Sequence, residues 1–236
     1  MLPPDELHRA RAEGTDKRPL DRTEWRSVLA LILLFIPVSL FWATYEQQGN
    51  TIPLWAETYT DRYIDLLVWK GEIPVTWFQA FNPFLIFAFT PLVIGLWAWQ
   101  TSRGREPSTV TKMAIGCFGV TLANLILACA AWVGAGASVS WLWLLGYFVV
   151  ITLGELYLSP LGLSLVSKVA PTRAVSLMMG VWLSTSFVGN FIGGWLGSYW
   201  GSMSRVDFFL MIAGIAAVAG LVIWSFNRPL KTVLGD

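Results

Sequence analysis

Six long stretches of mostly apolar residues run through the chain, and polar or turn-forming segments separate them. A helix needs about 20 mostly apolar residues to cross a bilayer, and every stretch meets that length. The one long connection is the first, where residues 57–73 leave room for a short amphipathic segment at the membrane surface. The pattern predicts an all-α membrane protein with six transmembrane helices at 27–46, 77–99, 112–134, 140–168, 174–200 and 206–226.

Composition supports a membrane location. The 236 residues are 55% hydrophobic and only 13% charged, whereas a soluble domain is roughly 25% charged. Residues 1–26 alone hold 12 of the 31 charged side chains. This excludes a disordered chain, and a net charge of +1 offers no electrostatic basis for binding nucleic acid. We expect a polar tail or linker (1–26), a six-helix bundle (27–228) and a second tail (229–236).

The basic residues predict the orientation of the bundle. Six spans place both termini on one side, and that side receives 13 Lys or Arg residues against three on the other. Cytoplasmic segments of membrane proteins carry an excess of Lys and Arg. Both termini are therefore expected in the cytoplasm.

Two acidic residues, Glu46 and Glu155, lie inside apolar stretches, and no Lys or Arg occurs in the apolar part of any span. A carboxylate at the membrane centre costs roughly 2.5–3.5 kcal/mol on insertion scales, so such residues are functional candidates. Either they are protonated part of the time, or another polypeptide supplies the positive charge. The alternative is that both face water near an interface.

Residues that break helices lie close to both acids. Gly49 and Pro53 follow Glu46, and Pro160 follows Glu155; Pro83 interrupts the second span. Interrupted helices near the middle of the membrane indicate the binding site of a transporter. We therefore expect helix breaks or gating positions at Gly49, Pro53, Pro83 and Pro160.

Residue spacing places other polar and aromatic side chains beside the acids. Trp42 and Glu46 are four residues apart, as are Glu155 and Ser159, so each pair shares a helical face. An indole beside a carboxylate suits a ligand that bears an amine, although ordinary helix packing explains either tryptophan equally well. The same spacing joins Trp182, Ser186 and Asn190.

A stripe of small residues, Gly189, Gly193 and Gly197, predicts close helix packing and no chemistry.

Nothing in the spans indicates a catalytic or metal site. Cys117 and Cys129 lie too far apart along one helix for a disulfide, and the only histidine, His8, is in the polar tail. Ser159 and Ser186 therefore lack a histidine base. We expect no metal, no catalytic residue and no enzyme activity.

These residues fall in four motifs that resemble the proton-dependent oligopeptide transporters of the major facilitator superfamily. Residues 41–51 (FWATYEQQGNT) resemble the family's seventh helix, and residues 77–83 (WFQAFNP) its eighth. Residues 154–164 (GELYLSPLGLS) resemble the tenth helix, and residues 178–182 (MMGVW) the eleventh. The resemblance implies the fold of the carboxy-terminal six-helix half and covers essentially residues 20–230.

The resemblance also implies roles for matching positions. Glu46 would bind the coupling proton, the only cofactor-like species expected, and Glu155 would hold the amino group of a di- or tripeptide. The implied peptide pocket includes Trp42, Asn82, Glu155, Trp182 and Ser186, and the spacing adds Ser159. The short turn at 134–140 resembles bacterial members, which implies a multi-pass protein of a bacterial inner membrane.

The resemblance leaves one half of the transporter unaccounted for. The family has at least twelve helices, and its first-helix motif and pocket cations do not occur in this sequence. We expect the chain to need an amino-terminal six-helix half or a second copy of itself. The alternatives are a non-transporting accessory or assembly module, or the inert product of a split or truncated gene. Nitrate or another solute is an alternative substrate, because relatives with the same fold carry such solutes.

Overall fold

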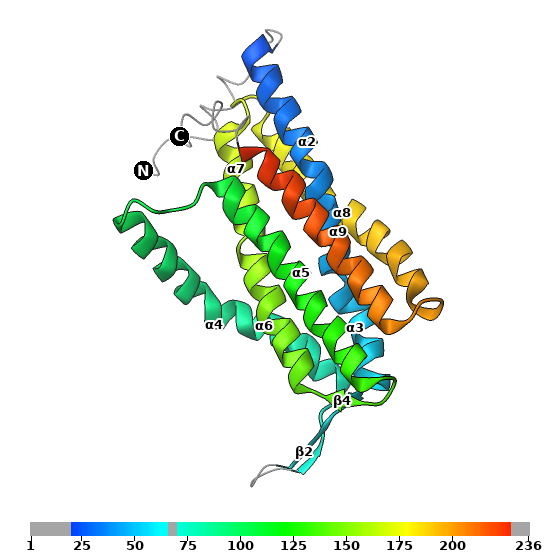
Figure 1. Ribbon diagram of the computed structural model, residues 1–236. Helices are drawn as coiled ribbons and strands as arrows, with labels where there is room; N and C mark the ends of the chain where they lie inside the picture. Colours follow the sequence, from blue (N-terminus) through cyan, green and yellow to red (C-terminus); the bar gives the residue numbers. More distant parts are fainter. Residues whose placement is uncertain (1–19, 66–69, 228–236) are drawn as a thin grey trace, which may run out of the picture.

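The computed structural model describes residues 20–65 and 70–227 (Figure 1). The polar tail expected at 1–26 falls mostly outside these ranges, and the tail expected at 229–236 falls wholly outside them. In chain order the elements are α2 (Arg22–Tyr45), α3 (Gln47–Thr58), β1 (Thr60–Asp61), β2 (Tyr63–Asp65), β3 (Lys70–Glu72), α4 (Val75–Ser102), α5 (Thr109–Gly134), β4 (Val139–Ser140), α6 (Leu142–Leu156), α7 (Ser159–Val169), α8 (Val175–Gly197), a 3₁₀ turn (Ser198–Gly201) and α9 (Arg205–Ser225).

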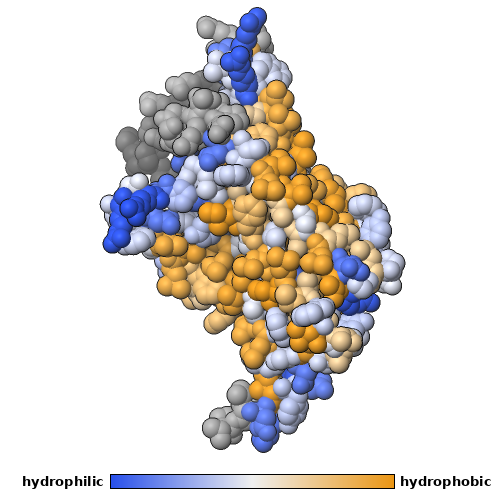
Figure 2. Space-filling view, in the orientation of Figure 1, coloured by the Kyte–Doolittle hydropathy of each residue, from blue (hydrophilic) through white to orange (hydrophobic). Residues whose placement is uncertain are grey.

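The prediction of six transmembrane helices is confirmed within the described residues. Six helical segments are long and apolar enough to cross a bilayer. Figure 2 shows a broad apolar surface in the middle of the molecule, with hydrophilic side chains gathered toward its two ends. The segments are Arg22–Thr58, Val75–Ser102, Thr109–Gly134, Leu142–Val169, Val175–Gly201 and Arg205–Ser225.

The first span is longer than the sequence predicts. The expected end at Glu46 is a local turn between α2 and α3, and the helix then continues to Thr58. The prediction of breaks at Gly49 and Pro53 is therefore wrong, because both residues lie inside α3. Proline removes one backbone hydrogen bond but is tolerated in a membrane helix where neighbouring groups satisfy the freed carbonyl.

The first long connection also differs from the expectation. Instead of an amphipathic segment, β2 and β3 form an antiparallel pair, and β1 pairs in parallel with β4. Side chains reinforce the antiparallel pair, because Arg62 donates to the carbonyl of Ile73 at 2.8 Å and lies 3.4 Å from the carboxylate of Glu72.

The two other proline positions behave differently from one another. Pro83 lies inside α4, which is continuous from Val75 to Ser102, so the predicted interruption of this span is wrong. The break expected near Pro160 is present, because α6 ends at Leu156 and α7 begins at Ser159. Proline is tolerated in the first turn of a helix, where its missing N–H would have no partner.

Glycines allow the helices of the bundle to approach one another closely. A Cβ atom at Gly116 of α5 would lie 2.6 Å from the carbonyl oxygen of Gly154 in α6. A Cβ atom at Gly189 of α8 would lie 2.3 Å from the Cβ of Trp42 in α2. At Gly193 it would lie 3.1 Å from the carbonyl oxygen of Ala43. These distances confirm that the stripe on α8 serves close packing.

Polar contacts organise the helix ends at one end of the bundle. The Asp21 carboxylate accepts hydrogen bonds from the backbone N–H groups of Glu24 and Thr23, which lower the pKa of Asp21. Glu106, in the loop between α4 and α5, accepts a hydrogen bond from Lys112, and this bond lowers the pKa of Glu106. Glu24 also forms an ion pair with Arg173, which joins the start of α2 to the segment before α8.

The packing of α2 against α8 yields a test. Gly189→Ala should lower the stability of the purified chain in detergent by about 1–3 kcal/mol, the usual effect of overpacking. Gly180→Ala is the matched control on the same helix, since a Cβ there would meet nothing within 4 Å. Thermal unfolding should show a lower midpoint for Gly189→Ala only. Equal midpoints for the two variants would contradict the packing shown.

Candidate functional site

Three helices meet at the carboxylate of Glu155. The hydroxyl of Tyr45, from α2, donates a short hydrogen bond to Oε2 of Glu155, from α6. The Nδ2 atom of Asn82, from α4, lies 3.1 Å from the same oxygen. It also lies 3.1 Å from the hydroxyls of Tyr45 and Thr152. Glu155, Tyr45, Asn82 and Thr152 are called the carboxylate cluster below.

Local structure explains why these side chains converge. Tyr45 is the last residue of α2, immediately before the turn at Glu46. Asn82 precedes Pro83 in α4, and Thr152 lies three residues before Glu155, on the same face of α6. The neighbouring residue Gly154 packs against the α5 backbone, with a would-be Cβ 2.7 Å from the carbonyl oxygen of Gly116. That contact sets the position of α6 beside α5 and thereby of Glu155.

Glu155 is satisfied by its own chain, whereas its sequence context predicts a bound proton, a positive charge from another polypeptide, or exposure to water. The donors are a phenol and an amide from the same chain, both uncharged at neutral pH. Tyr45 and Thr152 were not singled out from the sequence. Both stand within three residues of a predicted acid, but a neighbour in sequence becomes a partner only when the helices pack.

Glu46 has different surroundings. It occupies the turn between α2 and α3 and is half-buried. It lines an open cavity of about 220 Å³ together with Gly49 and Asn50 of α3 and Asn190, Gly193 and Gly194 of α8. Within the described part of the chain, no hydrogen bond or ion pair reaches its carboxylate.

The wall of this cavity is held together by amide side chains. Gln47 and Asn50 both donate to the carbonyl oxygen of Gly193, at 2.9 and 3.3 Å. Pro53 has no N–H to offer the carbonyl of Gly49, four residues earlier, and Gly49 lines the cavity. Gly49, predicted as a helix break, therefore lies beside Glu46, inside a helix that continues through Pro53.

The predicted tryptophans occupy distinct places. Trp42 is partly buried, and its ring centroid lies 5.5 Å from that of Tyr45 in an edge-on arrangement, so it adjoins the carboxylate cluster. Trp182 is only 3% exposed. It packs edge-on against Phe35 at 5.8 Å and fills the space over Gly162 of α7.

The two predicted serines also lie apart from the carboxylate cluster. Ser186 is partly exposed on α8 and donates to the carbonyl of Leu183 at 2.8 Å. Ser159 is the first residue of α7. Among the residues that the structure describes, no hydrogen bond or ring contact joins Trp182, Ser186 or Ser159 to Glu155. Their predicted roles in binding stay predictions.

No group of three or more His, Cys, Asp or Glu side chains suited to a metal occurs within residues 20–65 and 70–227.

Comparison with known proteins decides the family. The model of the POT family matches residues 13–205, which is most of the chain. The chain belongs to the POT family. The fold expected from the resemblance, six helices like one half of a major facilitator transporter, is confirmed, and the protein is a multi-pass membrane protein.

Curated POT relatives are similar along most of this chain. An uncharacterised transporter of Bacillus subtilis is 33% identical over 214 residues, 91% of this chain and 42% of the relative. A di-/tripeptide transporter of Lactococcus lactis subsp. cremoris is 28% identical over 220 residues, 93% of this chain and 44% of the relative. The chain thus spans less than half the length of these relatives.

Solved structures agree with the family assignment. A POT family transporter in complex with 5-aminolevulinic acid superposes with a TM-score of 0.82 and 27% identity, over 95% of this chain and 46% of that one. A POT family transporter in complex with a thioalcohol-conjugated peptide gives a TM-score of 0.82 and 26% identity, with the same coverage.

The carboxylate cluster of this POT chain predicts a stability difference between two tyrosine variants. Tyr45→Phe removes a donor from Glu155 and should lower the unfolding free energy in detergent by about 1 kcal/mol. Tyr147→Phe is the matched control, because the Tyr147 hydroxyl is fully buried and has no hydrogen-bond partner among the described residues. Tyr147→Phe should leave the thermal midpoint unchanged or raise it. An unchanged midpoint for Tyr45→Phe would show that the hydroxyl of Tyr45 does not support Glu155.

Proposed function

We propose that this chain is the carboxy-terminal half of a proton-coupled symporter for di- and tripeptides. The observation that carries the proposal is the arrangement of two intramembrane acids. Glu155 is held by donors from two other helices, and Glu46, next to Tyr45 in the chain, faces an open cavity. Intramembrane carboxylates on transport proteins mark substrate sites and proton relays, and a family relative is named a di-/tripeptide transporter.

Glu155 is assigned to the amino group of the peptide. An ammonium group is a stronger donor to a carboxylate than a phenol or an amide is. A bound peptide would therefore replace Tyr45 or Asn82 as a donor to Glu155. The released Asn82 amide would then be available to the peptide backbone, and the partly buried Trp42 ring beside Tyr45 would form part of the pocket wall.

Glu46 is assigned to the coupling proton. Its carboxylate has no bound donor among the described residues and faces a cavity. Such a group exchanges protons with the cavity without first breaking a hydrogen bond. In the complete transporter the charged form would pair with a cation from the other half, and protonation would release that pair. Rocking of one bundle against the other then follows from the change in charge.

The surface that would contact the amino-terminal half is assigned to α4 and α8. In the 18-residue apolar stretch of α4 only 11% is buried, and in that of α8 only 22% is buried. The corresponding share in the other spans is 39–56%. Figure 1 shows α4 diverging from the rest of the bundle toward its Ser102 end. A chain that covers less than half of its relatives needs such a surface to close a transport path.

The orientation follows from the charges. Arg103, Arg105 and Lys168 lie at one end of the spans, and we place that end in the cytoplasm of a bacterial cell, together with both termini. Arg62 and Arg205 then lie at the outer end.

The proton-coupling role is tested by Glu46→Gln. The full chain would be joined to the amino-terminal half of a POT relative and reconstituted in proteoliposomes. The variant should lose accumulation of a labelled dipeptide driven by a pH gradient, because it cannot take up the proton, yet it should retain dipeptide exchange. Glu57→Gln, an exposed acid at the end of α3, is the control. Full proton-driven accumulation by Glu46→Gln would overturn the assignment.

The peptide-binding role is tested by Glu155→Gln in the same chimera. Loss of one charge-assisted bond to the amino group should weaken dipeptide binding by about 10-fold or more. Exchange should fall together with driven uptake, unlike in Glu46→Gln.

The same assay on the chain alone separates the other candidates. Uptake by the chain alone would favour two copies acting together, and failure of the chimera in both modes would favour a non-transporting module.

A further inference from the structure

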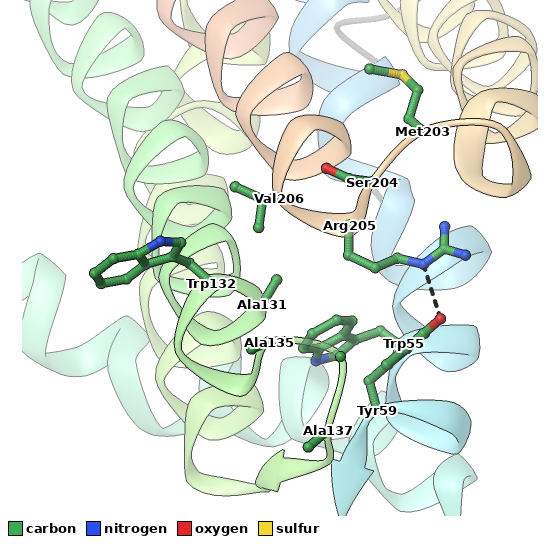
Figure 3. Close-up of a pocket in the computed structure, with 11 residues that line it drawn as sticks. Trp55, Tyr59, Ala131, Trp132, Ala135, Ala137, Met203, Ser204, Arg205 and Val206 are labelled. Carbon is green, nitrogen blue, oxygen red and sulfur yellow. Dashed lines mark hydrogen bonds between the residues drawn. The ribbon is translucent and has the colours of Figure 1, made fainter.

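A second cavity lies far from the carboxylate cluster, where α3 and α5 end and α9 begins (Figure 3). Its volume is about 560 Å³, within the range of small-molecule sites. Trp55 and Tyr59 of the first span, the turn at 135–137 and Arg205 at the start of α9 contribute to its wall. None of the motifs or transport roles described above involves this cavity.

One wall carries a buried donor without an acceptor. The side chain of Trp55 is 2% exposed, and its Nε1 has no hydrogen-bond partner within the described residues. The ring is fixed by stacking on Tyr59 at 5.0 Å and by an edge-on contact with Phe209 at 5.3 Å. Figure 3 shows the indole nitrogen on the side of the ring that faces the turn with Ala135 and Ala137. A buried N–H without an acceptor is rare in folded proteins, and a bound group that accepts a hydrogen bond is one explanation of it.

Another wall carries a cation without an acid. Nε of Arg205 lies 3.4 Å from the hydroxyl of Tyr59, and Nη1 donates to the carbonyl of Trp200. The guanidinium lies 4.1 Å from the ring centroid of Trp200. Among the described residues no carboxylate pairs with Arg205, and Asp207, two residues along, bonds Ser204 instead. A guanidinium has five N–H donors, so several of them are available to an anion.

The surroundings of the cavity point to a lipid. The cavity lies at the ends of membrane spans, where Trp and Tyr mark the interface with the headgroups. Trp132, which lines it, is 74% exposed, and exposed apolar side chains continue along α5 and α9 at Val133 and Leu210. Acyl chains have a surface to lie on beside a cavity that offers donors to an anion.

We propose that this cavity binds the phosphate of a phospholipid headgroup, with Arg205 and the N–H of Trp55 as donors. The acyl chains lie along the exposed apolar surface of α5 and α9. A lipid bound there joins the end of the first span to the start of the last one. The site does not depend on the transport function proposed above.

The test is native mass spectrometry of the full chain, delipidated in detergent and titrated with phosphatidylglycerol. Arg205→Gln should weaken binding by about 10-fold, the effect of losing one charge-assisted hydrogen bond. Trp55→Phe, which removes the N–H together with the five-membered ring of the indole, should weaken it less. Arg62→Gln is the matched control, because Arg62 lies at the same end of the bundle but pairs with Glu72. Diacylglycerol, which lacks the phosphate, should bind all four proteins equally.

Unchanged phosphatidylglycerol binding in Arg205→Gln and Trp55→Phe overturns the proposal, as does an equal loss in Arg62→Gln. Displacement of the lipid by inorganic phosphate at a similar concentration also overturns it, because the occupant would then be the free anion. If Arg205→Gln fails to fold, two other variants test the proposal. It requires weaker phosphatidylglycerol binding by Trp55→Phe and retained binding by Arg205→Lys.

Discussion

A carboxylate inside an apolar bundle needs donors, and in this protein the donors of Glu155 come from two other helices. Tyr45 is the last residue of α2, and Asn82 lies within α4. Helix α2 must therefore end, and α4 must pass, beside α6 at the depth of Glu155. The cost of leaving such a charge unsatisfied in hydrocarbon makes the meeting point a strong constraint on the packing of all three helices. The Gly154–Gly116 contact, one residue from the acid, holds α6 on α5 at that level.

Tyr45 connects the two intramembrane acids, because it bonds Glu155 and precedes Glu46 in the chain, yet the two carboxylates have different surroundings. Glu155 is engaged by Tyr45, whereas Glu46, the next residue after Tyr45, lies open to a cavity. Under the proposed function, this arrangement links the peptide site to the proton site. Any ligand that displaces the Tyr45 hydroxyl from Glu155 acts on the last residue of α2, and therefore on the turn that places Glu46.

The number and order of the spans were predictable from the sequence, because a helix that crosses the membrane needs about 20 consecutive, mostly apolar residues. The continuation of the first span through Asn50 and Pro53 was not predictable. Asn and Pro are typical of loops, and they are stable in a membrane helix only where neighbouring helices supply hydrogen-bond partners. Asn50 does bond the carbonyl of Gly193, 143 residues away. The carboxylate cluster was predictable only in part. The resemblance placed Asn82 and Glu155, which are 73 residues apart, in one pocket, but nothing in the sequence indicated that Tyr45, 110 residues from Glu155, bonds it. Spacing along one helix identifies a face, but it does not identify what packs on that face.

The side of α8 that carries Ser186 and Asn190 is polar, although the same helix also exposes Phe187 and Phe191. Asn190 is exposed there and lines the cavity of Glu46, and Ser186 lies one turn away on the same face. An exposed amide and a half-buried carboxylate in contact with hydrocarbon would lack partners, which the bilayer core cannot supply. Water or a polar protein surface must therefore meet this face. Under the proposed function, a second bundle across the cavity would supply that surface and would also cover the weakly buried α8 and α4.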